Sequence, residues 1–116
     1  MAQTIEIVRG STNTLRVSVL DATGLPYNLG SGEKVVFGVK KEKEDEDLLI
    51  TRVAEILYEG MYSIRLVPED SMDLEPGLYY YDVGLESGTD FFPIIKPSPF
   101  LIEPNVTRRG CTVNGG

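Results

Sequence analysis

The stretch Glu75-Pro-Gly-Leu-Tyr-Tyr-Tyr-Asp-Val-Gly-Leu-Glu86 decides the fold, because it joins a turn signal to an alternation of period two. The Pro-Gly pair marks a turn. After it, one set of alternate positions is apolar or aromatic, namely Tyr79, Tyr81, Val83 and Leu85, and the other set includes Tyr80, Asp82 and Glu86. Successive side chains of a strand point to opposite faces of its sheet. The stretch therefore predicts a β-strand with one buried face and one face in water.

The same alternation recurs in both directions along the chain. Apolar residues alternate with other residues in three more segments, at Leu15, Val17 and Val19, at Val35, Phe37 and Val39, and at Tyr62, Ile64 and Leu66. Shorter apolar segments lie near Ile5, at residues 48–56 and at residues 100–106, and turns that contain Gly separate most of these segments. This pattern predicts an all-β fold, an immunoglobulin-like antiparallel β-sandwich of about seven strands.

Three segments depart from simple alternation. Residues 48–56 place apolar side chains on both faces and give no clear strand parity. Ile94 and Ile95 are bracketed by prolines, and because Pro cannot donate a hydrogen bond to a strand ladder, we expect an edge or crossing strand there. Residues 68–74 suggest one helical turn, with Pro68 at its entry and Leu74 facing inward.

Length and charge limit the organisation and the partners of the chain. Its 116 residues fit one domain, which we expect to span residues 1–107 and to be followed by a flexible C-terminal tail, residues 108–116. The formal net charge of −7 opposes binding to nucleic acid or to an anionic membrane, because both reward clustered Lys and Arg. We read no secretory signal at the N-terminus and expect the chain to stay inside the producing cell.

Histidine is missing and cysteine is scarce, although carboxylates are plentiful. The chain has no histidine, which removes Ser-His and Cys-His catalysis. The single cysteine, Cys111, cannot form an internal disulfide or a structural zinc site, and it is read either as an incidental residue or as an intermolecular thiol. A hydrolase would need two carboxylates across a cleft, which a small sandwich rarely offers. We therefore expect no enzymatic activity and no cofactor.

An acidic run follows the strand that contains Val39. Its carboxylates Glu44, Asp45, Glu46 and Asp47 could gather oxygen ligands for calcium, but their spacing is wrong for an EF-hand. A solvated hairpin tip is the interpretation that we favour.

Three aromatic residues are the candidates for contact with a partner. Tyr80 has the parity opposite to the core positions of its strand, and Phe91 and Phe92 fall in a predicted loop. Exposed aromatic side chains often anchor protein interfaces. Core packing explains Phe91 and Phe92 equally well. The acidic run and the pair Arg108-Arg109 are further candidate contacts, which the sequence does not rank.

Three segments carry a family resemblance when their order and spacing are taken together. They are Ile7-Val-Arg-Gly-Ser-Thr-Asn-Thr-Leu-Arg-Val17, then Asp21-Ala-Thr-Gly-Leu-Pro-Tyr-Asn-Leu29 leading into Val35-Val-Phe-Gly-Val-Lys40, and then Ile64-Arg-Leu-Val-Pro-Glu-Asp70 followed by Leu74-Glu-Pro-Gly-Leu-Tyr-Tyr-Tyr-Asp-Val83. In this order they resemble the N-terminal domain of the phage baseplate upper protein family, an immunoglobulin-like tail and baseplate module.

The resemblance implies a function without an active site. It implies a virion structural protein, made in the bacterial cytoplasm, that docks to other tail or baseplate proteins, commonly in several copies, so that a homo-oligomer is also an expectation. The alternative is a bacterial surface or carbohydrate-binding β-sandwich domain, which predicts export and a row of exposed aromatic side chains on one face. The absence of Trp and of a readable signal counts against this alternative.

Overall fold

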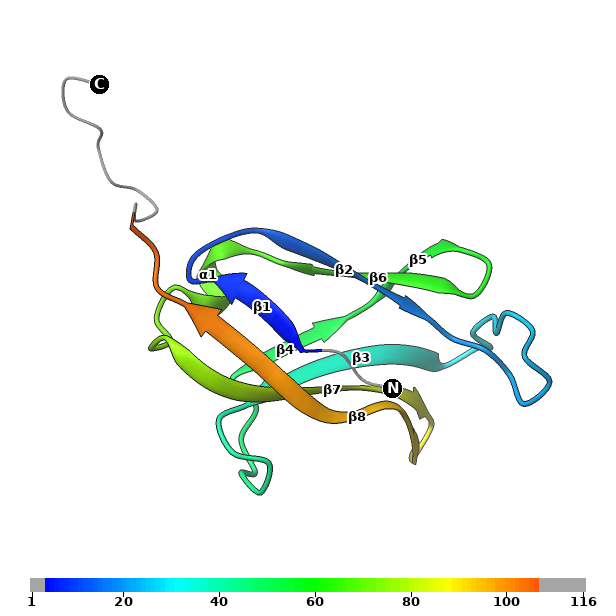
Figure 1. Ribbon diagram of the computed structural model, residues 1–116. Helices are drawn as coiled ribbons and strands as arrows, with labels where there is room; N and C mark the ends of the chain where they lie inside the picture. Colours follow the sequence, from blue (N-terminus) through cyan, green and yellow to red (C-terminus); the bar gives the residue numbers. More distant parts are fainter. Residues whose placement is uncertain (1–3, 107–116) are drawn as a thin grey trace.

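Eight β-strands and one short helix form the described part of the chain, residues 4–106 of this computed structural model (Figure 1). The prediction of an all-β fold is confirmed, with the helix as a small addition. The candidates Cys111 and Arg108-Arg109 lie outside the described residues. The elements are β1 (Ile5–Val8), β2 (Asn13–Ser18), β3 (Glu33–Lys40), β4 (Ile50–Val53), β5 (Glu55–Tyr58), β6 (Met61–Leu66), α1 (Pro68–Ser71), β7 (Gly77–Ser87) and β8 (Asp90–Glu103).

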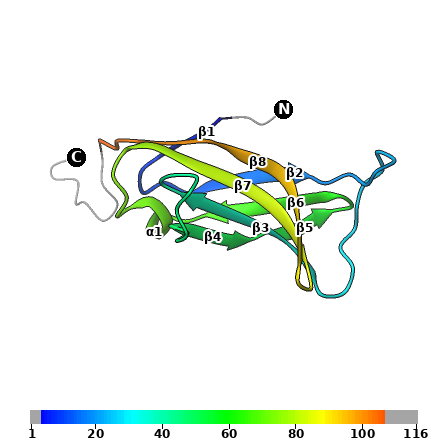
Figure 2. The same cartoon turned by 90° about the horizontal axis from the view of Figure 1, so that it is seen from below.

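The strands form two sheets that lie against each other as layers (Figures 1 and 2). One sheet has five strands in the order β1-β8-β7-β3-β4, and the other has three in the order β2-β6-β5. The alternating apolar positions of both sheets point into the space between them. The long hairpin of β7 and β8 makes up most of the five-stranded sheet.

The five-stranded sheet is mixed, so the expectation of a wholly antiparallel fold is wrong. Strand β1 pairs with β8 in parallel, with Ile5 beside Phe100 and Val8 beside Glu103. The other pairings between the named strands are antiparallel. After β1 the chain crosses to the other sheet and continues as β2, so no hairpin forces the direction of β1. Parallel pairing becomes available when two strands are distant in sequence.

Residues 48–56 form parts of two strands in different sheets, and the described residues contain eight strands where about seven were expected. Strand β4 pairs with β3 in one sheet, and after the single residue Ala54 strand β5 pairs with β6 in the other. Apolar side chains occur at both parities here because Leu49 and Val53 are exposed while Ile50 is buried. Arg52 shares the parity of Ile50, so a charged residue also interrupts the inward-facing positions.

Strand β8 is longer than the sequence pattern predicts. Phe91 and Phe92, expected in a loop, lie in its first residues, and the segment that begins at Phe100 continues the same strand. The register between β7 and β8 shifts around Val83, which lets the strands bend. Only residues 100–103 of β8 also pair with β1, so the Ile94-Ile95 segment is an edge, as predicted.

The core lies between the sheets and contains both predicted tyrosines. Tyr79 is 4% exposed and Tyr81 is 3% exposed. The ring of Tyr81 packs 5.9 Å from that of Phe37 and 6.3 Å from that of Phe100, measured between centroids. The buried set is Ile7, Val17, Val19, Val35, Phe37, Val39, Ile50, Tyr62, Ile64, Leu66, Tyr79, Tyr81, Val83, Phe100 and Ile102.

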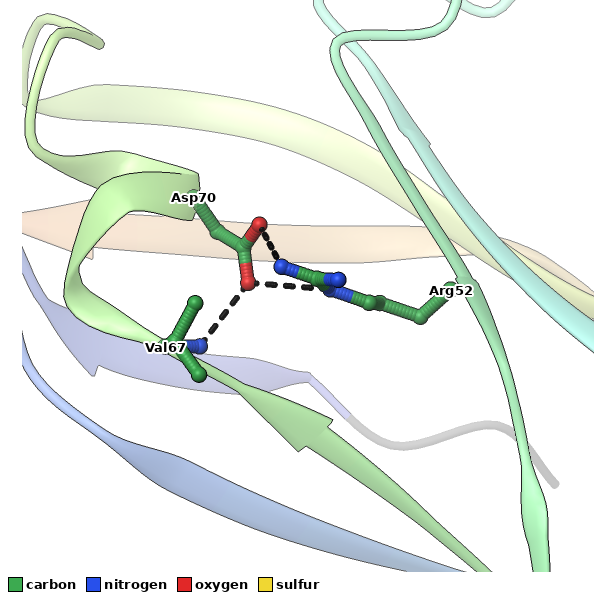
Figure 3. A network of polar contacts seen from close by, with 3 residues as sticks. All are labelled: Arg52, Val67 and Asp70. Atoms are coloured by element: carbon green, nitrogen blue, oxygen red, sulfur yellow. Dashed lines mark hydrogen bonds and ion pairs between the residues drawn. The ribbon is translucent and has the colours of Figure 1, made fainter.

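Helix α1 closes one end of the core and is fixed by a polar network (Figure 3). It begins at Pro68, as predicted, and Leu74 beyond it packs against the core. The carboxylate of Asp70 accepts a hydrogen bond from the backbone N–H of Val67 at 2.8 Å and one from Arg52 Nε at 3.1 Å. Since Arg52 belongs to β4, this network joins the helix to the edge of the five-stranded sheet.

Candidate interaction surfaces

Tyr80 lies on the outer face of the five-stranded sheet, with Lys40 of β3 beside it on one side and Pro99 of β8 on the other. Its side chain is partly buried. The ammonium group of Lys43, in the loop after β3, lies 4.9 Å from the centroid of the tyrosine ring. One face of the ring is therefore occupied by a cation–π contact.

Phe91 reaches the same outer face from β8. It pairs with Glu86 of β7 and is 49% exposed. Its ring lies directly over the backbone of Gly84, because a Cβ atom built on Gly84 would come within 2.1 Å of the phenylalanine Cζ. The absence of a side chain on Gly84 makes room for the outer end of the aromatic ring.

Phe92 takes the opposite side of the strand. It pairs with Leu85, a residue of inward parity, yet its side chain is 52% exposed. The structure thus brings Tyr80 and Phe91 to one face of the sheet and separates Phe92 from them. Neither phenylalanine belongs to the buried core cluster.

Apolar residues lie on the outer face of the five-stranded sheet near the Gly84 that Phe91 covers. Val53 of β4, Val36 of β3 and Gly84 of β7 form a row across three strands. Leu48 covers Gly38 as Phe91 covers Gly84, since a Cβ atom on Gly38 would lie 2.8 Å from its Cδ2. We call Val36, Leu48, Val53 and Phe91 the outer-face patch. Of these, Leu48, Val53 and Phe91 are exposed.

Asp82 lies on the same face, between Tyr80 and Gly84 along β7. Burial raises the pKa of its carboxyl above the ordinary value, and the positive charge of Lys40 opposes this rise. Burial disfavours the charged form of a carboxyl group because the surrounding protein solvates it less well than water does. The outer face therefore combines exposed apolar side chains with one partly desolvated acid.

A second group of exposed apolar residues lies at the end of the molecule where the loop after β2 meets the turn between β5 and β6 (Figure 1). The N–H of Val19 donates a 2.9 Å hydrogen bond to the carbonyl of Gly60. Pro26 also lies against Gly60, so closely that a Cβ atom built on Gly60 would be 2.5 Å from the Cβ atom of Pro26. We call the large exposed apolar residues of these two segments the loop-end patch. They are Leu20, Leu25, Ile56, Leu57 and Tyr58.

The loop-end patch was not predicted from the sequence. Ile56 is the last residue of the segment without clear parity, and Leu57 and Tyr58 follow it. The three residues belong to β5, which lies at the edge of its sheet and leaves them exposed. The available signal was the run of three apolar residues between Glu55 and Glu59, next to a Gly turn.

The acidic run is an exposed connection between the paired strands β3 and β4, as predicted for a solvated hairpin tip. The Asp45 carboxylate accepts a 3.0 Å hydrogen bond from the N–H of Glu42 within the loop. Among residues 4–106, no group of three or more His, Cys, Asp or Glu side chains is arranged to hold a metal ion. Within the same range no helix has the length and apolarity to cross a membrane.

A cleft of about 950 Å³ lies between β2 and β8. Its lining is mainly apolar, and its charged members are Arg16 and Lys96, so none of the carboxylates that a hydrolase would need is among them. The floor of the cleft is formed by core residues that are almost wholly buried. The lining is Ile5, Thr14, Leu15, Arg16, Val17, Ser18, Phe37, Ile64, Tyr81, Val83, Ile94, Ile95 and Lys96.

Comparison with known proteins gives no functional assignment for the chain. No protein-family model matches it, and no curated protein is similar enough to count as a match.

Proposed function

We propose that this chain is a non-enzymatic, immunoglobulin-like interaction module of a phage or prophage tail or baseplate, and that it acts in the virion by docking to other tail or baseplate proteins. The family resemblance of the three sequence segments supports this proposal. The strand order and one hydrogen bond at the start of β7 support the immunoglobulin-like assignment. The outer-face patch supports the docking function.

The strand order supports the immunoglobulin-like assignment in its variable form. In that form a sheet of strands A, B, E and D faces a sheet of G, F, C, C′ and C″. The order β2-β6-β5 facing β8-β7-β3-β4 matches B-E-D facing G-F-C-C′, whereas the first strand, β1, lies beside β8 and not in the sheet of β2. Strand β7 then takes the position of F, and β3 that of C.

A tyrosine hydrogen bond supports the same assignment. Immunoglobulin-like domains commonly carry a tyrosine near the start of strand F whose hydroxyl bonds to the backbone a few residues upstream. Tyr79, near the start of β7, donates a 2.6 Å hydrogen bond to the carbonyl of Glu75. The segment around it is the one that carries the third part of the family resemblance.

The observation that carries the docking function is the outer-face patch. Its exposed members, Leu48, Val53 and Phe91, come from the loop before β4, from β4 and from β8, so the patch extends across the strands from β4 to β8. Exposed apolar patches with an aromatic member mark protein contact sites more often than single scattered residues do.

Mass spectrometry of phage particles tests the proposal directly. Particles purified from the strain that encodes the chain should contain its peptides in a fixed ratio to the tail proteins. The Phe91→Ser variant should fold with a free energy of unfolding within about 0.5 kcal/mol of the unmodified chain but be depleted from the particles. Val8→Ser is the matched control, because Val8 is a similarly exposed apolar residue, 41%, on β1.

Two results would contradict the proposal. Absence of the unmodified chain from particles would remove the virion assignment, and a separate pull-down with an insoluble polysaccharide would then test the carbohydrate-binding alternative. Equal incorporation of the Phe91→Ser and Val8→Ser variants would remove the outer-face patch as the docking surface.

A further inference from the structure

We propose that the loop-end patch is a second docking surface, and that its partner is a protein whose contact region surrounds apolar side chains with Lys or Arg. This inference rests on the proposed docking function but concerns a different surface of the molecule. The surface is identified by its exposed apolar area, by the close contact of its two segments and by its charge.

The apolar exposure of this patch is high. Its five members are between 42% and 64% exposed, with Ile56 the most exposed of them. Ile56 pairs with Tyr62, which is fully buried, but β5 is the edge of the three-stranded sheet and its register is irregular between Ile56 and Tyr58. The edge position and the irregularity leave the apolar side chains of β5 uncovered.

The two segments of the patch hold each other in place. The backbone bond from Val19 to Gly60 and the contact of Pro26 with Gly60 fix the loop against the turn. The loop is also braced internally, because Asp21 Oδ1 accepts hydrogen bonds from the N–H groups of Thr23 and Leu25 at 2.8 and 3.0 Å. A surface that is ordered before binding loses less entropy when a partner docks.

The charge of these segments has one sign. Residues 19–33 and 53–61 contain the carboxylates of Asp21, Glu33, Glu55 and Glu59 and contain no Lys or Arg. Glu55 and Glu59 flank the three apolar residues of the β5 edge, and both are exposed. Within residues 4–106 neither side chain takes part in a hydrogen bond or an ion pair. Two unpaired acids beside an apolar surface favour a partner that supplies cations.

The same charges disfavour a second copy of this chain as the occupant. In a two-fold dimer the same patch faces itself. Glu55 and Glu59 of both copies would then meet around one apolar contact, and like charges placed across an interface weaken it. The short, irregular edge of β5 also gives few free backbone groups for strand addition. Docking here is therefore driven by side chains and directed by charge.

An NMR titration with three synthetic peptides tests this inference. The peptides are acetyl-Lys-Val-Lys-Phe-Lys-Val-Lys-amide and its analogues with Ser or Glu at every Lys position. The lysine peptide should shift the amide signals of Leu20, Leu25, Ile56, Leu57 and Tyr58 and bind at least about tenfold more tightly than the serine peptide. The glutamate peptide should not bind. Raising the salt concentration from about 0.05 M to about 0.5 M should weaken binding of the lysine peptide.

Variants separate this surface from a general attraction between opposite charges. The double variant Glu55→Lys/Glu59→Lys should lose the preference for the lysine peptide. The control Glu6→Lys/Glu103→Lys makes the same charge change at exposed positions on β1 and β8 and should keep it. Tyr58→Ser should weaken binding of the lysine peptide by about tenfold, in the range of an aromatic contact residue.

Three outcomes would overturn the inference. The first is that the lysine peptide shifts signals at the outer-face patch or over the whole surface, and the second is that the control double variant loses the preference for the lysine peptide equally. The third is self-association of the chain, measured by light scattering, that Tyr58→Ser abolishes. The two proposals can fail separately. A chain that enters phage particles without selecting the lysine peptide retains the proposed function and loses this surface. A chain that selects the peptide at this patch but is absent from particles retains the surface and loses the tail assignment.

Discussion

The hydroxyl of Tyr79 donates a 2.6 Å hydrogen bond to the backbone carbonyl of Glu75, four residues earlier, while the ring of Tyr79 lies in the core. Burial raises the pKa of this phenol above its ordinary value, as does the charge of Glu75. The bond ties the segment that follows α1 to the first residues of β7. One residue therefore joins the packing of the core to the geometry of the connection that leads into the longest hairpin.

Replacing this hydroxyl tests its contribution to stability. Tyr79→Phe keeps the ring and removes the hydrogen bond, so the free energy of unfolding should fall by about 1 kcal/mol, the usual contribution of one such bond. Chemical denaturation measures the difference. Tyr80→Phe is the matched control, because Tyr80 is partly buried on the outer face and its contact with Lys43 involves the ring. Equal effects of the two substitutions would contradict the special role of Tyr79.

The position of Phe91 depends on the absence of a side chain at Gly84. Gly84→Ala would place a methyl group where the ring lies, 2.1 Å from its Cζ in the present geometry, so the ring must move. We expect a loss of about 1 kcal/mol of stability from this crowding. In a Phe91→Ser background the same substitution should cost much less, so the two effects should not add. A double-mutant cycle by denaturation measures the coupling, and additive effects would mean that the ring does not rest on Gly84.

The alternating strands were predictable from the sequence because their two faces meet different surroundings. Leu15, Val17, Tyr79 and Tyr81 are apolar where the strand faces the core, and the residues between them face outward, as the period of two predicts. Pro68 likewise predicted the start of α1 through its fixed backbone angle. These features depend on local sequence, which is why a single chain reveals them.

The remaining features depend on pairing between distant segments. The change of sheet at Ala54 follows from β4 joining β3 while β5 joins β6, and no local pattern encodes both partners. The parallel pairing of Ile5 with Phe100 joins the two ends of the described chain. Of the three predicted contact residues, Tyr80 and Phe91 share a face only because β7 and β8 pair in this register. The loop-end patch was missed for the same reason, since the exposure of Ile56 depends on which strand lies at the edge.

Two aspartates should give opposite dependences of stability on pH. Burial raises the pKa of Asp82 in the folded protein above its pKa in the unfolded chain. The stability that this group contributes is therefore present below the unfolded-state pKa and is lost as the pH rises through the folded-state pKa. Asp82→Asn should therefore increase stability at neutral pH, and the difference should shrink as the pH falls below the ordinary value of 3.8.

Asp21 is the reference for the opposite sign. The side-chain hydrogen bond from Thr23 and the backbone N–H groups of Leu25 and Thr23 lower its pKa in the folded state. The stability that Asp21 contributes is present above its unfolded-state pKa and is lost as the pH falls through its folded-state pKa. Asp21→Asn should reduce stability at neutral pH and have little effect in strong acid. Thermal unfolding from pH 2 to pH 7 compares the two variants, and changes of the same sign would show that one of the two environments is misassigned.

The ion pair of Arg52 with Asp70 should contribute more to stability than the pair of Lys34 with Glu86. Asp70 is 13% exposed at its side chain and also accepts the N–H of Val67, whereas Lys34 and Glu86 are 53% and 44% exposed and 3.6 Å apart. Asp70→Ala leaves Arg52 and a helix-end N–H without their acceptor, so we expect a loss of about 2 kcal/mol. Lys34→Ala should change stability by less than about 0.5 kcal/mol, as is usual for exposed pairs. Denaturation in low and high salt completes the test, because salt screens exposed charges far more than partly buried ones. Salt should therefore leave the effect of Asp70→Ala largely intact, and an Asp70→Ala effect that disappears in high salt would place this network among ordinary surface pairs.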